Sequence, residues 1–180
     1  MRVLLLTPGF PPLTGGGERY VYELAQQLVG HGHAVTVVTS AAQRGEDFYR
    51  GATPEGSGVE MTDGLCVIRL PLRPLPGGRA GLLAWRKAMV LLSQLPDDQT
   101  PLLRRMARWV PPLVGLGETL AGLGPHDLVH AFNLSWEWAA VAGWLYARVR
   151  GVPLVVTPFL HLGRDRTSRE ALNSSMDHQR

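Results

Sequence analysis

Three consecutive glycines, Gly15–Gly17, stand between a proline-rich segment and a helical pattern. Glycine has no Cβ atom to hold a ligand away from the backbone, and free N–H groups at a helix start attract phosphate. The stretch therefore predicts a phosphate-binding loop. The alternative is that the glycines only relieve a sharp turn from strand to helix. Two features favour a ligand: Pro8, Pro11 and Pro12 stiffen an unusually long loop, and the loop follows a strand, where open α/β sheets bind ligands.

The loop does not fit the two best-known phosphate motifs. Its glycines are contiguous rather than spaced G-x-G-x-x-G, and the second expected strand, 35–39, is followed by Ser40 instead of the acidic residue that holds an adenine ribose. No Lys-Ser or Lys-Thr pair follows the glycines, as a P-loop requires. The sequence therefore argues against a nicotinamide-dependent dehydrogenase and excludes a P-loop.

Alternating strand and helix patterns must position this loop. Val21, Leu24, Ala25 and Leu28 recur at the spacing of one helix face, and the apolar run before the loop fits a strand buried on both faces. Right-handed crossovers then predict an α/β fold, a single Rossmann-like doubly wound parallel sheet of order 3-2-1-4-5 with helices on both faces. The strands expected in chain order are 3–6, 35–39, the second arm of a 59–70 hairpin that turns at Asp63-Gly64, 127–132 and 153–157.

Length and composition limit the class of protein. The 180 residues suffice for one well-packed domain, and no apolar run approaches the ~20 residues that cross a bilayer. A net charge of +3, without zinc-ligand spacing or a recognition helix, argues against nucleic-acid binding. The single Cys66 lies in an apolar run, and the chain starts with a strand pattern rather than a signal peptide. We therefore expect a cytoplasmic protein.

Several short segments occur in the order known from one enzyme family. Residues 11–18 have the form P-P-x-x-G-G-x-E, Leu24-Ala25 follows, 32–37 reads Gly-His-Ala-Val-Thr-Val, and 127–131 reads Asp-Leu-Val-His-Ala. This series resembles the opening of the family 4 glycosyltransferases, retaining enzymes built from two Rossmann-like domains in the GT-B architecture. The resemblance covers residues 1–163 and implies an amino-terminal, acceptor-side domain. Residues 164–180 are predicted to be a polar tail, the start of the interdomain region.

The resemblance implies half of an enzyme. In the family, a second, carboxyl-terminal Rossmann-like domain holds the nucleotide sugar through an E-x7-E pair, and no two glutamates of this chain have that spacing. The implied reaction transfers a hexose from a nucleotide sugar to a hydroxyl acceptor with retention of configuration and without a cofactor. We expect no metal ion, because the sequence lacks a DxD-like pair at a strand end. The competing interpretation is a non-catalytic Rossmann-like module, a degenerate half-transferase that binds a partner.

The resemblance also implies the donor-side residues. Gly15, Gly16 and Gly17 would bring backbone N–H groups to the donor diphosphate and offset its charge as the nucleotide leaves. His161 follows the fifth expected strand, where family members commonly carry a histidine that faces the sugar–phosphate linkage. It is the candidate catalytic residue, donating a hydrogen bond near that linkage. The alternative is a surface histidine without a role.

The acceptor-side candidates are Glu18, Phe132 and Asn133. Glu18 closes the Gly-rich motif, and the other two stand at the carboxyl end of the fourth expected strand, where they could line the acceptor cleft. His130 alternates within the same buried strand. We expect it to be a hydrogen-bonded core histidine rather than a catalyst.

Two amphipathic helical patterns occupy residues 82–110, the second beginning at a Thr100 cap. Between Arg69 and Val110, eight basic and two acidic residues give a charge of +6, against +3 for the whole chain. Either both helices cover the sheet and hold their arginines in water, or they contact anionic lipid at the inner membrane surface. The residues predicted to be buried are Leu82, Trp85, Met89 and Leu92 in the first helix and Leu102, Met106, Trp109 and Leu113 in the second.

Overall fold

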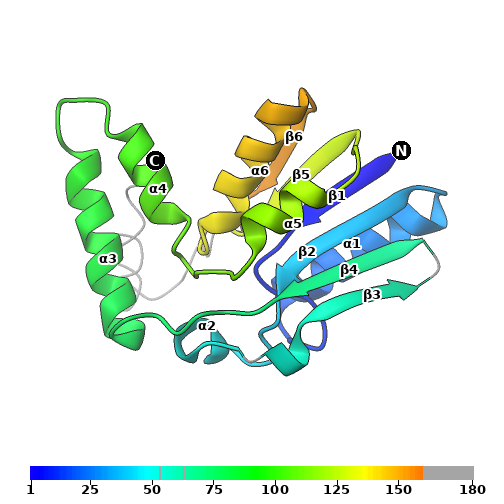
Figure 1. Ribbon diagram of the computed structural model, residues 1–180, viewed down its shortest axis with the longest axis horizontal. Coiled ribbons are helices and arrows are strands. Elements are labelled where there is room, and N and C mark those ends of the chain that lie inside the picture. The colour runs from blue at the N-terminus through cyan, green and yellow to red at the C-terminus, as the bar shows by residue number, and fades with distance from the viewer. Residues whose placement is uncertain (53, 63, 160–180) are drawn as a thin grey trace.

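A six-stranded sheet forms the centre of the molecule, which a computed structural model describes for residues 1–52, 54–62 and 64–159. The strand order is β3-β4-β2-β1-β5-β6 (Figure 1). All neighbouring strands are parallel except β3 and β4. The strands are β1 (Arg2–Leu6), β2 (Ala34–Ser40), β3 (Gly58–Thr62), β4 (Leu65–Leu70), β5 (Leu128–Phe132) and β6 (Leu154–Thr157).

The parallel order 3-2-1-4-5 is confirmed, because it corresponds to β4, β2, β1, β5 and β6. The sheet differs from the prediction by one strand. The first arm of the hairpin, β3, pairs antiparallel with β4 and forms the edge of the sheet. All five residues of β3 are exposed, so its place in the sheet rests on backbone pairing with β4 and not on burial of its side chains.

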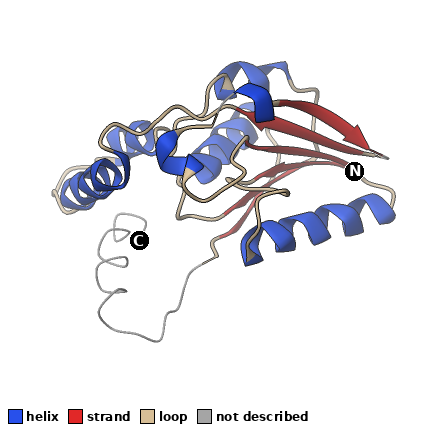
Figure 2. Cartoon of the chain, turned by 90° about the horizontal axis from the view of Figure 1, so that it is seen from below, coloured by secondary structure: helices blue, strands red, loops and turns tan. Residues whose placement is uncertain are grey.

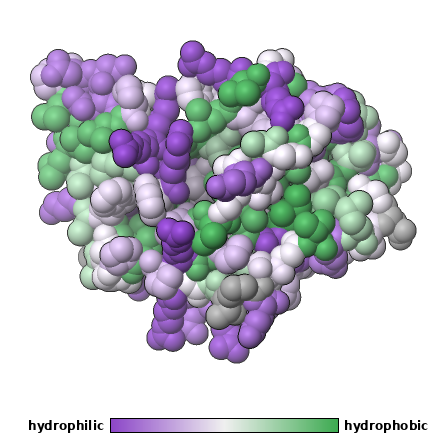
Figure 3. All heavy atoms as spheres, viewed as in Figure 1, coloured by the Kyte–Doolittle hydropathy of each residue, from purple (hydrophilic) through white to green (hydrophobic). Residues whose placement is uncertain are grey.

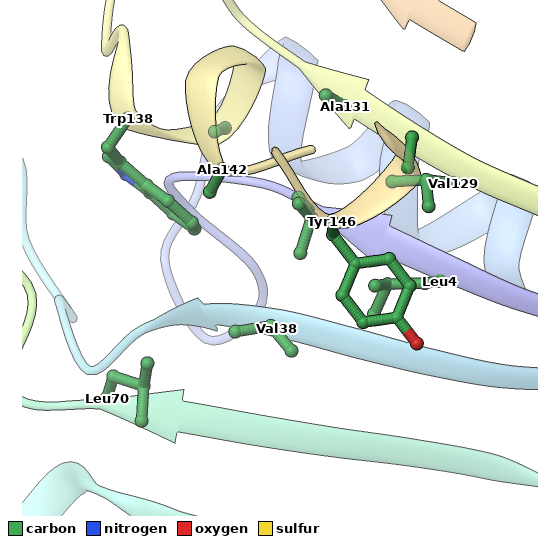
Figure 4. Close-up of a cluster of buried hydrophobic side chains, with 11 residues drawn as sticks. Leu4, Val38, Leu70, Val129, Ala131, Trp138, Ala142 and Tyr146 are labelled. Atoms are coloured by element: carbon green, nitrogen blue, oxygen red, sulfur yellow. The ribbon is translucent and has the colours of Figure 1, made fainter. Parts of the chain in front are cut away.

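Helices lie on both faces of the sheet (Figure 2). Val21 and Ala25 of α1 are buried against one face, so the predicted apolar stripe is confirmed. Helix α6 covers the opposite face, where Trp138, Ala142 and Tyr146 point toward the strands (Figure 4). The helices are α1 (Gly16–Gly30), α2 (Asp47–Arg50), α3 (Gly78–Ser93), α4 (Thr100–Ala107), α5 (Leu116–Gly122) and α6 (Trp138–Arg150), with one 3-10 turn at Pro54–Gly56.

The helices α3 and α4 do not cover the sheet. They form a hairpin that stands beyond the carboxyl ends of the parallel strands, at the left of Figure 1, and α3 packs on α2 and α4 while α4 packs on α6. Leu82 and Met89 are buried as predicted, but Trp85, Leu102 and Trp109 are exposed by 40%, 43% and 53%. The prediction was wrong for Trp85 and Leu102 because a helix packed on another helix buries a narrower stripe than one packed on a sheet. It was wrong for Trp109 because α4 ends at Ala107, so Trp109 lies beyond the helix.

The start of α4 is also shifted by one residue. Its cap is Gln99, with Pro101 in the first turn, while the Thr100 backbone N–H donates to the Asp98 carboxylate at 3.0 Å. None of the helices within the described ranges combines the length and the apolar character needed to cross a membrane.

Candidate functional site

The loop that follows β1, residues 7–15, is fastened to its neighbours at the carboxyl edge of the sheet. Ser40 Oγ at the end of β2 donates to the Pro8 carbonyl at 2.5 Å, and Arg69 Nη2 from β4 donates to the Pro11 carbonyl at 2.6 Å. Within the loop, Thr7 Oγ1 donates to the Gly9 carbonyl at 2.9 Å. Because two strands hold the loop from the side, it presents the start of α1 in a fixed orientation.

The three glycines of the loop have three different surroundings. A Cβ on Gly15 would lie 2.1 Å from Glu18 Oε2, and one on Gly17 would lie 3.4 Å from the Phe159 ring. A Cβ on Gly16 would meet nothing within 4 Å. Gly15 is extended, with φ 177°, and none of the three lies in the left-handed region. The turn therefore does not require glycine for its backbone angles, and Gly16 is the position with open space before it.

The first turn of α1 leaves backbone N–H groups available to a ligand. No side chain caps the helix, and no acceptor bonds the N–H of Gly16 or Gly17 within the part of the chain that the structure describes. The helix dipole adds partial positive charge at this point. The Glu18 carboxylate lies on the loop side of the helix start, against Gly9 and Gly15. An anion can therefore approach from the side of Gly16.

An aromatic cluster stands beside the glycines. Tyr20 of α1 makes edge contacts with Phe159, at 5.4 Å between ring centroids, and with Phe132, at 6.3 Å. Phe132 and Phe159 stack on each other at 6.0 Å. Phe159 has φ 49°, an unusual backbone angle for a residue other than glycine. Tyr20 is half exposed, so this cluster offers an aromatic surface next to the start of α1.

His130 lies next to this cluster and is partly buried. Its ring stacks on Phe132 at 3.9 Å, and its Nε2 lies 2.8 Å from Thr157 Oγ1 of β6. Burial lowers the pKa of His130 to about 4, so the ring is neutral at physiological pH. The expected hydrogen bond is confirmed, whereas the side chain is only partly buried.

The acceptor-side candidates are gathered at the same edge but differ in access. Phe132 is only 1% exposed, so it supports the rings of Tyr20 and Phe159 rather than presenting a surface of its own. Asn133 has φ 64°, and its Oδ1 accepts a hydrogen bond from the Ser135 N–H at 2.9 Å. This hydrogen bond within a tight loop fixes the orientation of its side-chain amide. Its part in acceptor binding stays a prediction. His161 lies outside the described residues.

Two contributors to this site were missed in the sequence. Arg69 spans from β4 to the loop and also pairs with Glu60, with 3.6 Å between Nη2 and Oε2. Tyr20 sits one turn into α1 on a position that the apolar stripe did not include. The signal for Arg69 was available, because it is a charged residue near the carboxyl end of an otherwise apolar strand.

No cluster of three or more histidine, cysteine or acidic side chains suited to a metal ion occurs in residues 1–52, 54–62 and 64–159. The described residues at this edge offer backbone N–H groups and a helix dipole for an anion, an aromatic surface, and the Glu18 carboxylate nearby.

Comparison with known proteins identifies the family. The sequence model of the glycosyl transferase 4-like domain matches residues 15–177. The match begins at the Gly-rich start of α1, includes every helix from α1 to α6, and reaches into the segment predicted as a polar tail, whose boundary stays a prediction. No curated protein matches the chain significantly. With this match over most of its length and a Rossmann-like sheet of the expected order, the chain belongs to the glycosyl transferase 4-like family as the amino-terminal half of a GT-B fold.

Proposed function

We propose that this domain forms the acceptor side of the cleft in a retaining glycosyltransferase that moves a hexose from a nucleotide sugar to a hydroxyl acceptor. The observation that carries the proposal is the open Gly16 at the start of α1, on the edge of a sheet that belongs to a glycosyltransferase family. A diphosphate there would accept hydrogen bonds from Gly16 and Gly17 N–H groups and lie at the positive end of the helix dipole.

In this mechanism the chain's residues act by positioning and by charge. As the sugar–phosphate bond breaks, negative charge grows on the diphosphate, and the preorganised N–H groups stabilise it. The Glu18 carboxylate, on the other side of the helix start, accepts a hydrogen bond from the acceptor hydroxyl. Tyr20 and Phe159 present an aromatic surface against which a sugar ring can pack. His161 donates a hydrogen bond to the donor near the same linkage.

We expect the 180-residue chain alone to show no turnover with any nucleotide sugar. The nucleotide-binding contacts of the proposed enzyme come from a second Rossmann-like domain, joined to this one in the active protein. Transfer and donor hydrolysis should be measured for the chain alone and for a fusion with such a domain from a family member. Steady turnover by the chain alone would contradict the assignment of nucleotide binding to a second domain. A fusion that folds but never transfers would instead favour the non-catalytic, partner-binding module.

A contact with anionic lipid through residues 82–110 is a second part of the proposal. The hairpin α3–α4 exposes Leu83, Leu91 and Leu95, and hydrophobic and hydrophilic side chains lie side by side at the left of Figure 3. We expect sedimentation with anionic vesicles that weakens with salt, because surface attraction decays over about 8–10 Å at physiological ionic strength.

The arginines of α4 and of the residue that follows it provide the test of that contact. Changing Arg104, Arg105 and Arg108 to glutamine should abolish vesicle binding. The matched control changes Arg19, Arg44 and Arg50 to glutamine, which removes the same charge elsewhere on the molecule. Equal loss in both triple variants, or no binding at low salt, would refute the contact.

A further inference from the structure

A cavity lies away from the Gly-rich edge, on the face of the sheet that α6 covers. It has a volume of about 790 Å³, is open to solvent on one side, and is bordered mainly by α6, α5 and the segment that joins α4 to α5. Its volume is typical of sites that bind small molecules. None of the loop 7–15 or of α1 lines it. Whatever binds there does so independently of the proposed diphosphate site.

The cavity is long and mainly apolar. Its floor contains Trp138 and Ala142, and it extends along α6 to Val149, a distance of roughly 17 Å at 1.5 Å per residue. Leu116 and Leu120 of α5 form one wall. Val149 is 80% exposed, and Trp109 at the other end is 53% exposed. Apolar surface that a ligand could bury therefore lies in water.

The charged residues around the cavity have one sign. Arg73, Arg105, Arg108 and Arg150 line it, and no aspartate or glutamate is among the lining residues. Within the described part of the chain, none of these four arginines forms a salt bridge, although five other arginines do. A site with this charge is complementary to an anion, and guanidinium groups suit phosphate by geometry.

Three of the arginines gather at one end. The Arg73 backbone N–H donates to the Pro112 carbonyl at 3.0 Å, and Pro112 forms a β-bridge with Trp109. Trp109 directly follows Arg108 and comes four residues after Arg105, so these two arginines lie near Arg73. Arg150, at the far end, is held by the carbonyls of α5, with Nη2 at 3.2 Å from Ala121 O and 3.1 Å from Leu123 O. The cationic end therefore lies near the carboxyl ends of the strands, and the apolar channel leads away from it.

We propose that this cavity binds a single-chain phosphate amphiphile, an alkyl or isoprenyl monophosphate, with the chain along α6 and the phosphate among Arg73, Arg105 and Arg108. The length of the channel fits an extended hydrocarbon chain, and the guanidinium groups at its mouth, which form no salt bridge with any described residue, neutralise the phosphate. The site places an amphiphile's head toward the edge of the sheet that holds the Gly-rich loop.

A glycine of the cavity wall allows a clean blocking variant. Gly117 of α5 lines the cavity, and a Cβ there would meet nothing within 4 Å, so Gly117→Phe fills the channel without strain or change of charge. The matched control is Gly122→Phe, in the same helix, equally free of neighbours and outside the cavity lining. Calorimetric titration with monomeric decyl phosphate should show saturable binding that Gly117→Phe weakens by about tenfold or more and that Gly122→Phe leaves unchanged.

The charge and the chain are tested separately with two further probes. The double variant Arg73→Gln, Arg105→Gln should weaken the binding of decyl phosphate by about tenfold and leave the binding of decanol unchanged. The control double variant Arg79→Gln, Arg148→Gln should change the binding of neither probe. Inorganic phosphate should bind far more weakly than decyl phosphate. The proposal is overturned if folded Gly117→Phe binds decyl phosphate like the parent, if inorganic phosphate binds equally well, or if binding appears only with micelles or vesicles.

Discussion

Replacing Gly16 with valine is expected to lower the transfer rate of the completed, two-domain enzyme by about 10²–10³ while the domain stays folded. The β-branched side chain would push the diphosphate away from the N–H groups at the start of α1. Removing one such preorganised donor costs about 3–4 kcal/mol of transition-state stabilisation. Stability should change little, because Gly16 has no positive φ and a Cβ there meets no neighbour within 4 Å.

Gly30→Val is the matched control for this substitution. Gly30 ends the same helix, and its Cβ would also meet no neighbour within 4 Å. Rate and melting temperature should be measured together for both variants. An unchanged rate in folded Gly16→Val would remove the loop from the mechanism. A rate loss that follows a loss of melting temperature, in both variants alike, would show that the glycine serves the helix and not a ligand.

Replacing Arg86 with methionine is expected to lower the free energy of unfolding by about 3–5 kcal/mol, the usual result of removing one partner of a buried ion pair. Arg86 of α3 and Glu137 at the start of α6 are each 5% exposed, with 3.3 Å between Nε and Oε1. Arg86 also donates to the Ser135 carbonyl and lies 5.4 Å from the centre of the Trp136 ring. This arginine therefore ties the α3–α4 hairpin to the loop between β5 and α6.

Urea unfolding of three variants tests the role of the pair. Arg86→Met leaves the buried carboxylate without its guanidinium, whereas the double variant with Glu137→Gln removes both charges and should recover part of the loss. Arg79→Met, on an exposed position of the same helix, should change the unfolding free energy by less than about 0.5 kcal/mol. A loss below about 1 kcal/mol in Arg86→Met, or no recovery in the double variant, would contradict the role of Arg86 as an anchor.

Most strands of the sheet could be predicted from local sequence patterns. Continuous apolar runs such as 3–6 identified buried parallel strands, and the handedness of crossovers then left one order for them. β3 was predicted as a hairpin arm but not as a sheet member, since its side chains are exposed and its place depends only on backbone pairing with β4.

The packing of α3 could not be predicted for a different reason. Its buried stripe is Leu82, Arg86 and Met89, so a charged residue occupies the middle of the apolar face. An interpretation based on hydrophobic spacing predicts that an arginine is exposed to water. The Glu137 that compensates its charge lies far away in the sequence. The periodicity identified the helix correctly, but it could not reveal a partner that only the tertiary fold supplies.

The sequence located the candidate site, but it did not distinguish the roles of its three glycines. The three glycines look equivalent in the sequence. Their difference arises from Glu18, which fills the space before Gly15, and from Phe159, whose ring lies against Gly17. Both contacts depend on side chains folding back over the helix start, and the Phe159 contact joins residues at opposite ends of the described chain.

The most direct test of the central claim is a titration of the ¹⁵N-labelled chain with pyrophosphate, followed through backbone amide signals. Pyrophosphate is the part that all nucleoside-diphosphate-sugar donors share, so the test does not depend on the nucleotide or the sugar. We expect the N–H signals of Gly16 and Gly17 to shift saturably, the signal of Gly30 to stay in place, and the shifts to vanish in Gly16→Val. Unmoved signals at Gly16 and Gly17 while pyrophosphate binds elsewhere, or the same shifts in Gly16→Val, would contradict the claim that this helix start receives the donor diphosphate.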